Sequence, residues 1–361
     1  MKKSIKIVLL VLTVCIGIML LAVCGLFAWL TITEYRPEAK ENAPVHLTAS
    51  GENTDRILKE GQELSILTWN TGYAGLDASV DFFMDGGTMV NPAGSEVIRE
   101  NMNGILEQLQ EEADGIFLLQ EVDRDCSRTM GVDELEYYVQ QTGYSWAYGV
   151  NYRCKYVPYP LPPLGRMETG VATLSGFLCE EDAVRVSLPC PFSWPVRTAN
   201  LKRCLLISRF PVEGTDRQLV AVNLHLEAYD SGEGKAAQTA ALLEILEEEY
   251  RKGNYVIAGG DFNQSFPGSF ETYPVKNPEL WAPGELEMDE LPEGFRLVYD
   301  SETPTCRLLN QPYDPEDEAT QYYIIDGFIV SDNLEVQLVE TKDLAFRYSD
   351  HNPVRLVVKL K

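Results

Sequence analysis

Short apolar runs, each adjoining an acidic, amide or histidine side chain, recur along this chain of 361 residues. Apolar runs of about four to eight residues are typical of buried strands. The polar residues at these runs are Asn70, Glu121, His225, Asp261 and His351. Side chains at the carboxyl ends of neighbouring strands meet at one edge of a sheet. We therefore expect each of the five runs to deliver its polar group at its carboxyl end, so that potential metal ligands, acids and bases gather at one edge of a sheet.

Helical and strand-like patterns alternate from residue 62 onward. Apolar side chains at helical spacing predict helices at 95–112 and 235–251, the second followed by Gly253 as a C-terminal cap. Between these helices four strand-like runs follow one another, at 170–178, 184–188, 203–208 and 219–226. Because no helix separates them, the sheet must be partly antiparallel. With three more strands expected at 322–358, the order predicts two packed sheets with outer helices.

The segment at 5–31 is almost wholly apolar, with no charge between Lys6 and Glu34. A run of about 20 apolar residues suffices to span a bilayer. The run is longer than a usual signal-peptide core and has no clear cleavage site, which favours an uncleaved anchor over a cleaved signal or a lipoprotein site at Cys24. Lysines ahead of the run predict a cytoplasmic N-terminus, with the rest of the chain outside the cell membrane.

The expected organisation has three parts. Residues 1–32 form a short cytoplasmic N-terminus and a single transmembrane helix. Residues 33–60 are polar and contain prolines, which predicts a stalk, and residues 61–361 form the main domain. His46 falls in the stalk, where we expect it to be solvated and without a chemical role.

The charge of the chain limits its partners. It has 30 basic and 55 acidic residues, which gives a net charge of −25. Nucleic acids are polyanions, and the proteins that bind them normally carry a basic footprint. Extended contact with DNA or RNA is therefore disfavoured, whereas a local basic cleft stays compatible with the composition. The main expected role of the acidity is solubility.

Two of the 8 cysteines lie in the N-terminal apolar run, and the others lie in the main domain. An even number in an oxidising space permits disulfides but fixes no pairing, and free buried cysteines are the alternative. No Cys-x-x-Cys pair is present, so a zinc site built on cysteine is not expected.

Three oxygen-bearing side chains are candidates for a metal site. Glu121 follows a buried run, and a carboxylate there needs water, a partner or a metal because its bare burial is costly. Asn70 and Asp350 offer further oxygen ligands. Such ligands suit a hard cation such as Mg²⁺, which keeps water ligands and binds phosphate. We therefore expect a Mg²⁺ site, with Mn²⁺ as a substitute.

Two histidines and three polar side chains are candidates for catalysis. His351 is a candidate base that needs a partner to fix its tautomer, and Asp326, inside an apolar run, suits that role. Asp261 and Asn263 alternate along a turn that we expect to be extended, so that both side chains face one side and orient an attacking water. His225 suits donation to a phosphoryl oxygen on which charge develops.

Taken in order, these motifs resemble the endonuclease/exonuclease/phosphatase superfamily, which includes DNase I-like nucleases, neutral sphingomyelinases and inositol-polyphosphate phosphatases. The resemblance covers residues 64–360 and rests on Asn70, Gln120-Glu121, Asn223-x-His225, Gly260-Asp261-Phe262-Asn263, Ile325-Asp326 and Ser349-Asp350-His351-x-Pro353. It implies a four-layer α/β sandwich, in which two packed mixed β-sheets are flanked by helices. It also implies Mg²⁺-dependent cleavage of phosphoesters.

By position, the resemblance implies that Glu121 is the principal metal ligand, with Asn70 and Asp350 assisting. One departure matters, because many nuclease members carry an acid two residues after the strand asparagine, where this chain has Gly72. In this respect the chain resembles the lipid- and phosphatase-directed branches more than the abasic-site endonucleases, and a second metal site is less expected.

The resemblance also assigns roles to the remaining polar residues. It implies that His351 is a base oriented by Asp326 and that His225 stabilises the pentavalent transition state. It implies that Asp261 and Asn263 position the nucleophile and the phosphate. Whether Asp261 or His351 takes the proton of the water stays open.

The expected function is that of a membrane-tethered, outward-facing, Mg²⁺-dependent phosphodiesterase or phosphatase that acts by in-line attack of water. The net charge and Gly72 favour a small or lipid phosphoester over a long polynucleotide. A metal-dependent nuclease acting on DNA or RNA is the leading alternative, and a non-catalytic binding module on the same fold is the second. A surface loop or lid is expected at 266–293, and the proline-rich stretch at 152–166 is expected to overhang the same rim and to shape substrate choice.

Overall fold

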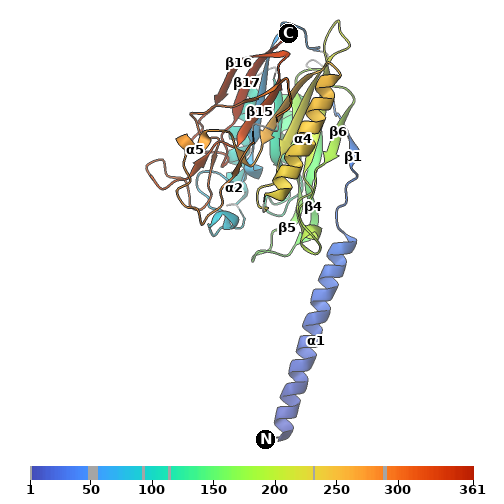
Figure 1. Cartoon of the computed structure of the whole chain (residues 1–361). Helices are drawn as coiled ribbons and strands as arrows, with labels where there is room; N and C mark the ends of the chain where they lie inside the picture. The colour runs from blue at the N-terminus through green and yellow to red at the C-terminus, as the bar shows by residue number, and fades with distance from the viewer. Residues whose placement is uncertain (1, 48–55, 92–93, 113–114, 231, 288–290) are drawn as a thin grey trace.

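Two β-sheets pack face to face, and helices cover their outer faces (Figure 1). The computed structural model describes residues 2–47, 56–91, 94–112, 115–230, 232–287 and 291–361. The expected four-layer α/β sandwich is confirmed, and a single long helix at the N-terminus extends away from it.

The larger sheet has seven strands among the described residues. Their order is β1 (Lys40–Pro44), β6 (Asp182–Ser187), β7 (Cys204–Pro211), β8 (Gln218–His225), β9 (Tyr255–Asp261), β15 (Asp326–Ser331) and β12 (Phe295–Val298). Strands β8 and β9 are parallel, and the other neighbouring pairs are antiparallel. The carboxyl ends of β8 and β9 therefore lie side by side, with His225 opposite Asp261.

The second sheet has six strands within the described ranges. Their order is β16 (Leu334–Thr341), β17 (Val354–Leu360), β2 (Glu63–Asn70), β3 (Ile116–Asp123), β5 (Gly165–Ser175) and β4 (Ser145–Val157). Here β2 and β3 are parallel, so that Asn70 lies opposite Gln120. Each sheet thus contributes one parallel pair whose carboxyl ends point to the same edge of the sandwich.

Apolar side chains from both sheets form the core between them, including Ile66, Leu118, Ile257 and Phe328. These residues alternate along their strands with side chains that face the helices, as a two-sided buried sheet requires. Each Å² of apolar surface removed from water contributes about 25 cal/mol, so burial at this interface is the main contribution that holds the two sheets together.

The helices cover the two outer faces. Helix α2 (Ser95–Glu111) and helix α3 (Glu134–Thr142) pack against β2, β3 and β5, with Ile105 and Leu109 of α2 in one cluster with Phe117. Helix α4 (Glu233–Arg251) covers β8 and β9 through Leu242 and Leu246. The predicted helices at 95–112 and 235–251 are therefore confirmed, with Gly253 at φ +87° just beyond α4.

Shorter elements connect the layers. They are the 3₁₀ turns Gly72–Ala74, Phe83–Asp85 and Val196–Ala199, the helix α5 (Ser269–Thr272), and the strands β10 (Gln264–Ser265), β11 (Gly284–Glu285), β13 (Cys306–Arg307) and β14 (Tyr322–Tyr323). The segment at 266–293, expected as a loop, thus includes α5 and β11, while its residues 288–290 lie outside the described ranges. The tail at 322–358 has the short β14 in addition to the three expected strands.

The predicted stalk at 33–60 is only partly a linker. Lys40–Pro44 pairs with β6 and becomes the edge strand β1, because Ala43 is buried against Ala183 and Leu206. His46 is exposed, as predicted, but its ring stacks on Trp146 with 4.1 Å between ring centroids. Residues 48–55 of the predicted stalk lie outside the described ranges.

Helix α1 (Lys2–Ile32) is long and apolar enough to cross a membrane by length and composition. Its segment Ser4–Ile32 has a window of mean hydropathy 3.2. Signal sequences have the same properties, so the anchor and its orientation stay predictions.

The cysteines are all unpaired, and those at 126, 154, 179, 204 and 306 are buried. This finding agrees with the free-cysteine alternative. Burial raises the pKa of Cys179 and Cys306 to about 12, so both remain thiols at neutral pH.

Candidate active site

The two parallel strand pairs bring four predicted site residues to one edge of the sandwich. Asn70, His225 and Asp261 are the last residues of β2, β8 and β9, and Glu121 lies in β3. Asp326 instead is the first residue of β15 and pairs with Asp261. His351 precedes β17, so it too arrives from an amino end. The expectation that each of the five groups lies at the carboxyl end of a strand was wrong for His351, because the antiparallel strand β17 presents its amino end at this edge.

A β-bulge aims Glu121 at the site. The register between β3 and β5 shifts between Leu119 and Val122, and Glu121 has a φ of +55°, in the left-handed region that non-glycine residues seldom adopt. The bulge interrupts the alternation of side chains along β3. As a result the carboxylate lines the pocket and keeps 26% of its side chain exposed. Backbone strain of this kind persists where the surrounding structure enforces it, and it clusters at functional sites.

His351 is held by Asp326, as the sequence predicts. Nδ1 of His351 donates to Oδ2 of Asp326 at 2.8 Å. Thr305 fixes Asp326 in turn, because its hydroxyl accepts the backbone N–H of Asp326. Burial lowers the pKa of His351, but the negative charges of Asp326 and Asp350 outweigh it and hold that pKa well above 6.5. The imidazole therefore has a fixed orientation, with Nε2 directed away from Asp326.

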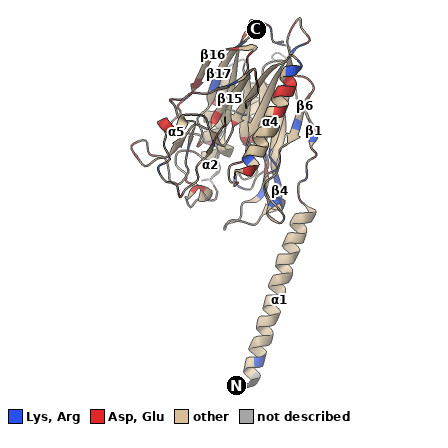
Figure 2. Ribbon diagram, in the orientation of Figure 1, with Lys and Arg blue, Asp and Glu red and all other residues tan. Residues whose placement is uncertain are grey.

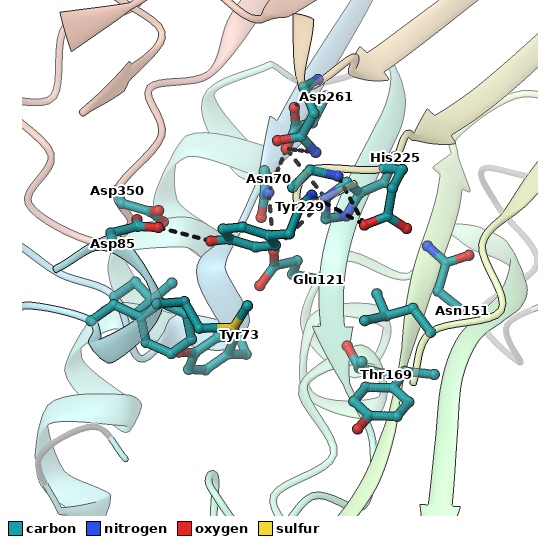
Figure 3. Close-up of a pocket in the computed structure, with 18 of the residues that line it drawn as sticks. Asn70, Tyr73, Asp85, Glu121, Asn151, Thr169, His225, Tyr229, Asp261 and Asp350 are labelled. Atoms are coloured by element: carbon teal, nitrogen blue, oxygen red, sulfur yellow. Dashed lines mark hydrogen bonds and ion pairs between the residues drawn. The ribbon is translucent and has the colours of Figure 1, made fainter. Parts of the chain in front are cut away.

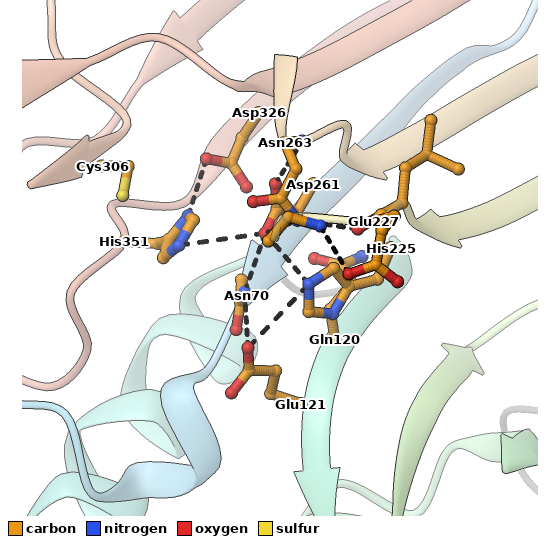
Figure 4. Close-up of polar contacts among 12 residues, drawn as sticks. Asn70, Gln120, Glu121, His225, Glu227, Asp261, Asn263, Cys306, Asp326 and His351 are labelled. Atoms are coloured by element: carbon orange, nitrogen blue, oxygen red, sulfur yellow. Dashed lines mark hydrogen bonds and ion pairs between the residues drawn. The ribbon is translucent and has the colours of Figure 1, made fainter. Parts of the chain in front are cut away.

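Asp261 lies at the centre of the cluster (Figure 4). Its Oδ2 accepts from Nδ2 of Asn70 at 3.0 Å and lies 3.4 Å from Nε2 of His225. The same oxygen lies 3.9 Å from Nε2 of His351. Burial, and next the charge of Asp326, raise the pKa of Asp261 to about 6. Burial lowers the pKa of His225 well below 6.5, so this imidazole is neutral.

Asn263 reaches the site by a different route from the one expected. Its φ is +50°, so the turn after β9 is not extended. Nδ2 of Asn263 donates to the carbonyl of Leu226 at 2.8 Å, and its backbone N–H donates to Oδ1 of Asp261. The side chain still lines the pocket, because the left-handed turn folds it back over Asp261.

Acidic groups gather where the metal was predicted. Burial raises the pKa of Asp350 to about 7, against the opposing charge of His351 and with a further contribution from Glu121. Burial likewise raises the pKa of Asp85. Carboxylates that oppose one another's ionisation are relieved by a divalent cation, so Glu121 and Asp350 fit a Mg²⁺ site.

The orientation of Asn70 differs from that of a metal ligand. Its Nδ2 faces Glu121 and Asp261, while its Oδ1 accepts the backbone N–H of Gly72 at 3.1 Å. In this structure Asn70 therefore bridges the two carboxylates, and its role as a ligand stays a prediction.

Two compact sets of buried donor atoms also lie nearby. They are Cys306, Asp350 and His351, and Asp261, Asp326 and His351, each with its donor atoms within 4.8 Å of one another. Both sets use His351, and Nδ1 of this residue is already bonded to Asp326. We favour the side of Glu121 and Asp350 for a hydrated cation, because Glu121 is open to the pocket.

The site lies in a pocket of about 550 Å³ (Figure 3). Several of its residues carry no local sequence signal, because loops remote in the chain supply them. Tyr229 donates to Asp85 at 2.8 Å, and the guanidinium of Arg128 lies 3.4 Å from the ring centroid of Tyr73. Arg307 also lines the pocket, and it ends the motif Pro304-Thr305-Cys306-Arg307, which resembles the segment that precedes the aspartate strand in the superfamily.

A buried amide pair joins the two sheets behind the site. Nε2 of Gln120 donates to Oδ1 of Asn223 at 2.8 Å, and Nδ2 of Asn223 donates to the carbonyls of Leu119 and Ala172. Because Glu121 follows Gln120 and His225 lies two residues after Asn223, this bridge fixes the spacing of Glu121 and His225.

No protein-family model and no curated protein matches the chain. Solved structures do resemble it. An endonuclease/exonuclease/phosphatase protein from Beutenbergia cavernae has a TM-score of 0.54 at 17% identity, over 83% of this chain and 72% of that one. The human nocturnin catalytic domain with bound sulfate has a TM-score of 0.50 at 16% identity, over 84% and 95%.

A third similar structure is ANGEL2, a 2′,3′-cyclic phosphatase in complex with adenosine-2′,3′-vanadate. Its TM-score is 0.50 at 14% identity, over 82% of this chain and 96% of that one. Identities this low support a shared fold and leave the reaction to be argued from the site. The chain described here therefore has the endonuclease/exonuclease/phosphatase fold.

Proposed function

We propose that the protein is a Mg²⁺-dependent hydrolase of phosphoesters. One observation carries the proposal: the predicted acid, base and ligand residues, dispersed from Asn70 to His351, converge on one pocket. At its inner wall, Asp261 contacts Asn70 and His225, and His351 is held from behind by Asp326 at 2.8 Å. A purely structural role would not require so many buried ionisable groups to face a common cavity.

Glu121 and Asp350 would hold the cation, with Asn70 assisting. When bound, Mg²⁺ neutralises the phosphate and polarises its ester oxygens. Bound sulfate in the nocturnin domain and vanadate in ANGEL2 belong to those proteins, and they support anion binding on this fold.

The other side chains of the site supply positioning and proton transfer. Asp326 holds His351, so that Nε2 faces the centre of the cluster. Asp261 and His351 both lie near the position of the attacking water. Asp261 can accept its proton as a carboxylate, whereas His351 can do so only after it has lost the proton that its raised pKa retains, and which of the two acts stays open. His225, neutral and buried, can donate from Nε2 to a phosphoryl oxygen in the transition state.

A small or lipid phosphoester is the favoured substrate. The pocket walls include Phe82, Tyr152, Val157 and Leu164, which suit an apolar group beside the phosphate. The net charge of −25 opposes extended binding to a polynucleotide. A nuclease stays the alternative, and Arg128 and Arg307 in the pocket are the observation in its favour.

Helix α1 would tether the enzyme, with the sandwich on the outer side of the cell membrane. The hydropathy of Ser4–Ile32 and the lysines ahead of it support this arrangement.

Turnover by the full-length protein in detergent micelles tests the proposal. The substrates would be a chromogenic phosphodiester, plasmid DNA and RNA, each with Mg²⁺ and with a chelator. We expect chelator-sensitive hydrolysis of the small diester, abolished by Glu121→Ala and by His351→Ala. His46→Ala is the matched control, because His46 is exposed and stacks on Trp146 outside the pocket.

Unchanged activity in both site variants would contradict the proposal. Preferential turnover of DNA or RNA would favour the nuclease. Binding of Mg²⁺ without turnover of any substrate would indicate a non-catalytic module.

A further inference from the structure

The last turns of α1 pack directly on a wall of the pocket. Leu30 is only 3% exposed and belongs to one apolar cluster with Tyr152, Val157 and Met167. These three residues of β4 and β5 also line the pocket. The same apolar cluster thus includes the end of the predicted membrane helix and part of the pocket wall.

A second contact fixes α1 to the loop that follows β6. The indole Nε1 of Trp194 donates to Oγ1 of Thr31 at 3.0 Å, and its ring lies 6.2 Å from that of Phe27. Arg197 pairs with Glu34 at 3.2 Å. Phe192, Ala199 and Leu201 of this loop line the pocket as well. The orientation of the pocket relative to α1 is therefore defined by contacts rather than left to a flexible linker.

Large apolar side chains are exposed beside this junction. Leu161 is 87% exposed and Tyr159 69%, both in the loop between β4 and β5. Trp194 and Val196 are 56% and 57% exposed. We call these four residues the apolar lip. An exposed apolar group of this kind marks an interaction surface, and tryptophan and tyrosine favour the membrane–water interface.

Basic side chains flank the apolar lip on a strongly acidic protein. Arg153, Lys155 and Arg166 are exposed on the ends of β4 and β5 that lead to the lip. Figure 2 shows basic residues at the end of β4 that faces α1. Arg153 and Arg166 also pair with Glu168 and Asp125 of the protein itself. A basic group near an anionic lipid surface contributes about 1 kcal/mol of attraction, and pairing within the protein reduces this contribution.

We propose that the apolar lip rests in the headgroup region of the leaflet from which α1 emerges, and that the pocket takes a phospholipid directly from that leaflet. The proposal rests on the proposed function and names its substrate class. We choose a bilayer as the partner of the apolar lip because the lip adjoins the predicted membrane helix. Leu30 packs on the pocket wall, and Thr31 accepts a hydrogen bond from Trp194 of the lip.

The dimensions suit a headgroup rather than a whole lipid. A pocket of about 550 Å³ accommodates a group of small-molecule size. The phosphate would meet Glu121, Asp350 and His351 at the inner end. The acyl chains would stay at the outer wall of Val157 and Leu164 and at the lip, and need not leave the bilayer fully.

Fluorescence quenching tests the membrane contact without reference to catalysis. Full-length protein is reconstituted into phosphatidylcholine vesicles with and without lipids brominated along the acyl chains. Leu161→Trp adds a reporter at the lip, and Leu338→Trp adds one on β16 at a site that is 38% exposed. We expect added quenching for Leu161→Trp over the parent and none for Leu338→Trp. Equal quenching of the two variants would overturn the membrane contact.

Turnover tests the delivery of lipid. Leu161→Glu with Val196→Glu charges the lip at exposed positions, and Leu338→Glu with Val275→Glu is the matched control. The vesicles contain phosphatidylcholine, sphingomyelin and phosphatidylglycerol, and a soluble chromogenic diester is assayed in parallel. We expect the lip variant to lose roughly 10-fold or more of its lipid turnover, while its turnover of the soluble diester stays within about twofold.

The outcomes separate this inference from the proposed function. Equal loss on both substrates, or no loss on lipid, would overturn the delivery of lipid by the lip. Turnover of the soluble diester but of no lipid would overturn the substrate class and leave the hydrolase intact. No turnover of any substrate, with Leu161→Trp still quenched, would overturn the hydrolase and the lipid substrate together and retain the membrane contact.

Discussion

His351 and Asp326 form their 2.8 Å hydrogen bond across the two sheets of the sandwich. Asp326 begins β15 in the seven-stranded sheet, whereas His351 precedes β17 in the six-stranded sheet. The separation of the sheets therefore sets the geometry of the pair. This arrangement couples the packing of the core to the chemistry of the site.

Asp326→Asn should lower kcat by about 10²–10⁴-fold on a soluble phosphodiester, because the amide cannot hold or stabilise the imidazole as a carboxylate does. Asp332→Asn, just beyond the other end of β15, is the control and should retain activity. The measurement is steady-state kinetics, with thermal unfolding to check that both variants fold. A kcat for Asp326→Asn equal to that of the parent would contradict the role of the pair.

Glu121→Gln and Asp350→Asn should each weaken Mn²⁺ binding by at least about 10-fold, because each removes a charged oxygen ligand from the predicted site. Isothermal titration calorimetry measures the affinity directly. Glu244→Gln, an exposed change on α4, controls for net charge. Unaltered affinity in both site variants would place the cation elsewhere, with the buried set of Asp261, Asp326 and His351 as the next candidate.

Gly72→Ala should abolish most activity through a steric clash. Gly72 has a φ of +52°, and a Cβ there would lie 2.9 Å from Oδ1 of Asp350 and 3.0 Å from Oγ of Ser349. Gly61→Ala is the matched control, because Gly61 has a φ of +74° and no atom within 4 Å of its Cβ position. Both variants should lose about 1–2 kcal/mol of stability from the left-handed backbone. Only Gly72→Ala should lose activity; similar kinetics for the two would show that Asp350 tolerates displacement.

Glu249→Gln should destabilise the fold at neutral pH and remove part of its acid sensitivity. Burial would raise the pKa of Glu249, but Arg209 and Lys252 lower it to about 2, against 4.5 for the free side chain. A lowered folded-state pKa means that this stabilisation is present above about pH 4.5 and is lost as the pH falls toward 2. The loss of charge-assisted hydrogen bonds to Arg209 should cost about 1.5–3 kcal/mol at neutral pH.

Thermal unfolding across this acidic range measures the effect of Glu249→Gln. Glu248→Gln is the control, because Glu248 is exposed on the same helix and pairs with Lys252. A slope of stability against pH that is the same in parent and Glu249→Gln would show that the Arg209 pair does not drive the acid sensitivity.

Much of the fold was predictable, because its helices and strands follow from the local periodicity of apolar residues. The helices at 95–112 and 235–251 and the strand-like runs between them followed from the spacing of apolar residues, which depends only on near neighbours. Lys40–Pro44 was missed as a strand because its sequence is polar and its pairing with β6 depends on a partner some 140 residues away in sequence.

The sequence also identified the candidate site residues, but it did not show how the backbone directs their side chains into the pocket. Glu121 was identified as an acid after a buried run, but its left-handed backbone depends on the bulge against β5. The folded-back turn at Asn263 depends on a carbonyl of Leu226, and the pair of Asp85 and Tyr229 joins two loops. None of these contacts leaves a local pattern.

The sequence by itself determined which elements form, which residues carry ionisable groups at strand ends, and that a long apolar helix precedes the domain. Only the tertiary structure decided that β15 and β17 present Asp326 and His351 from opposite sheets, and that α1 ends against Tyr152 and Val157 on the pocket wall. The physical reason is that secondary structure follows from short-range spacing, whereas a site follows from the packing of segments that are distant along the chain.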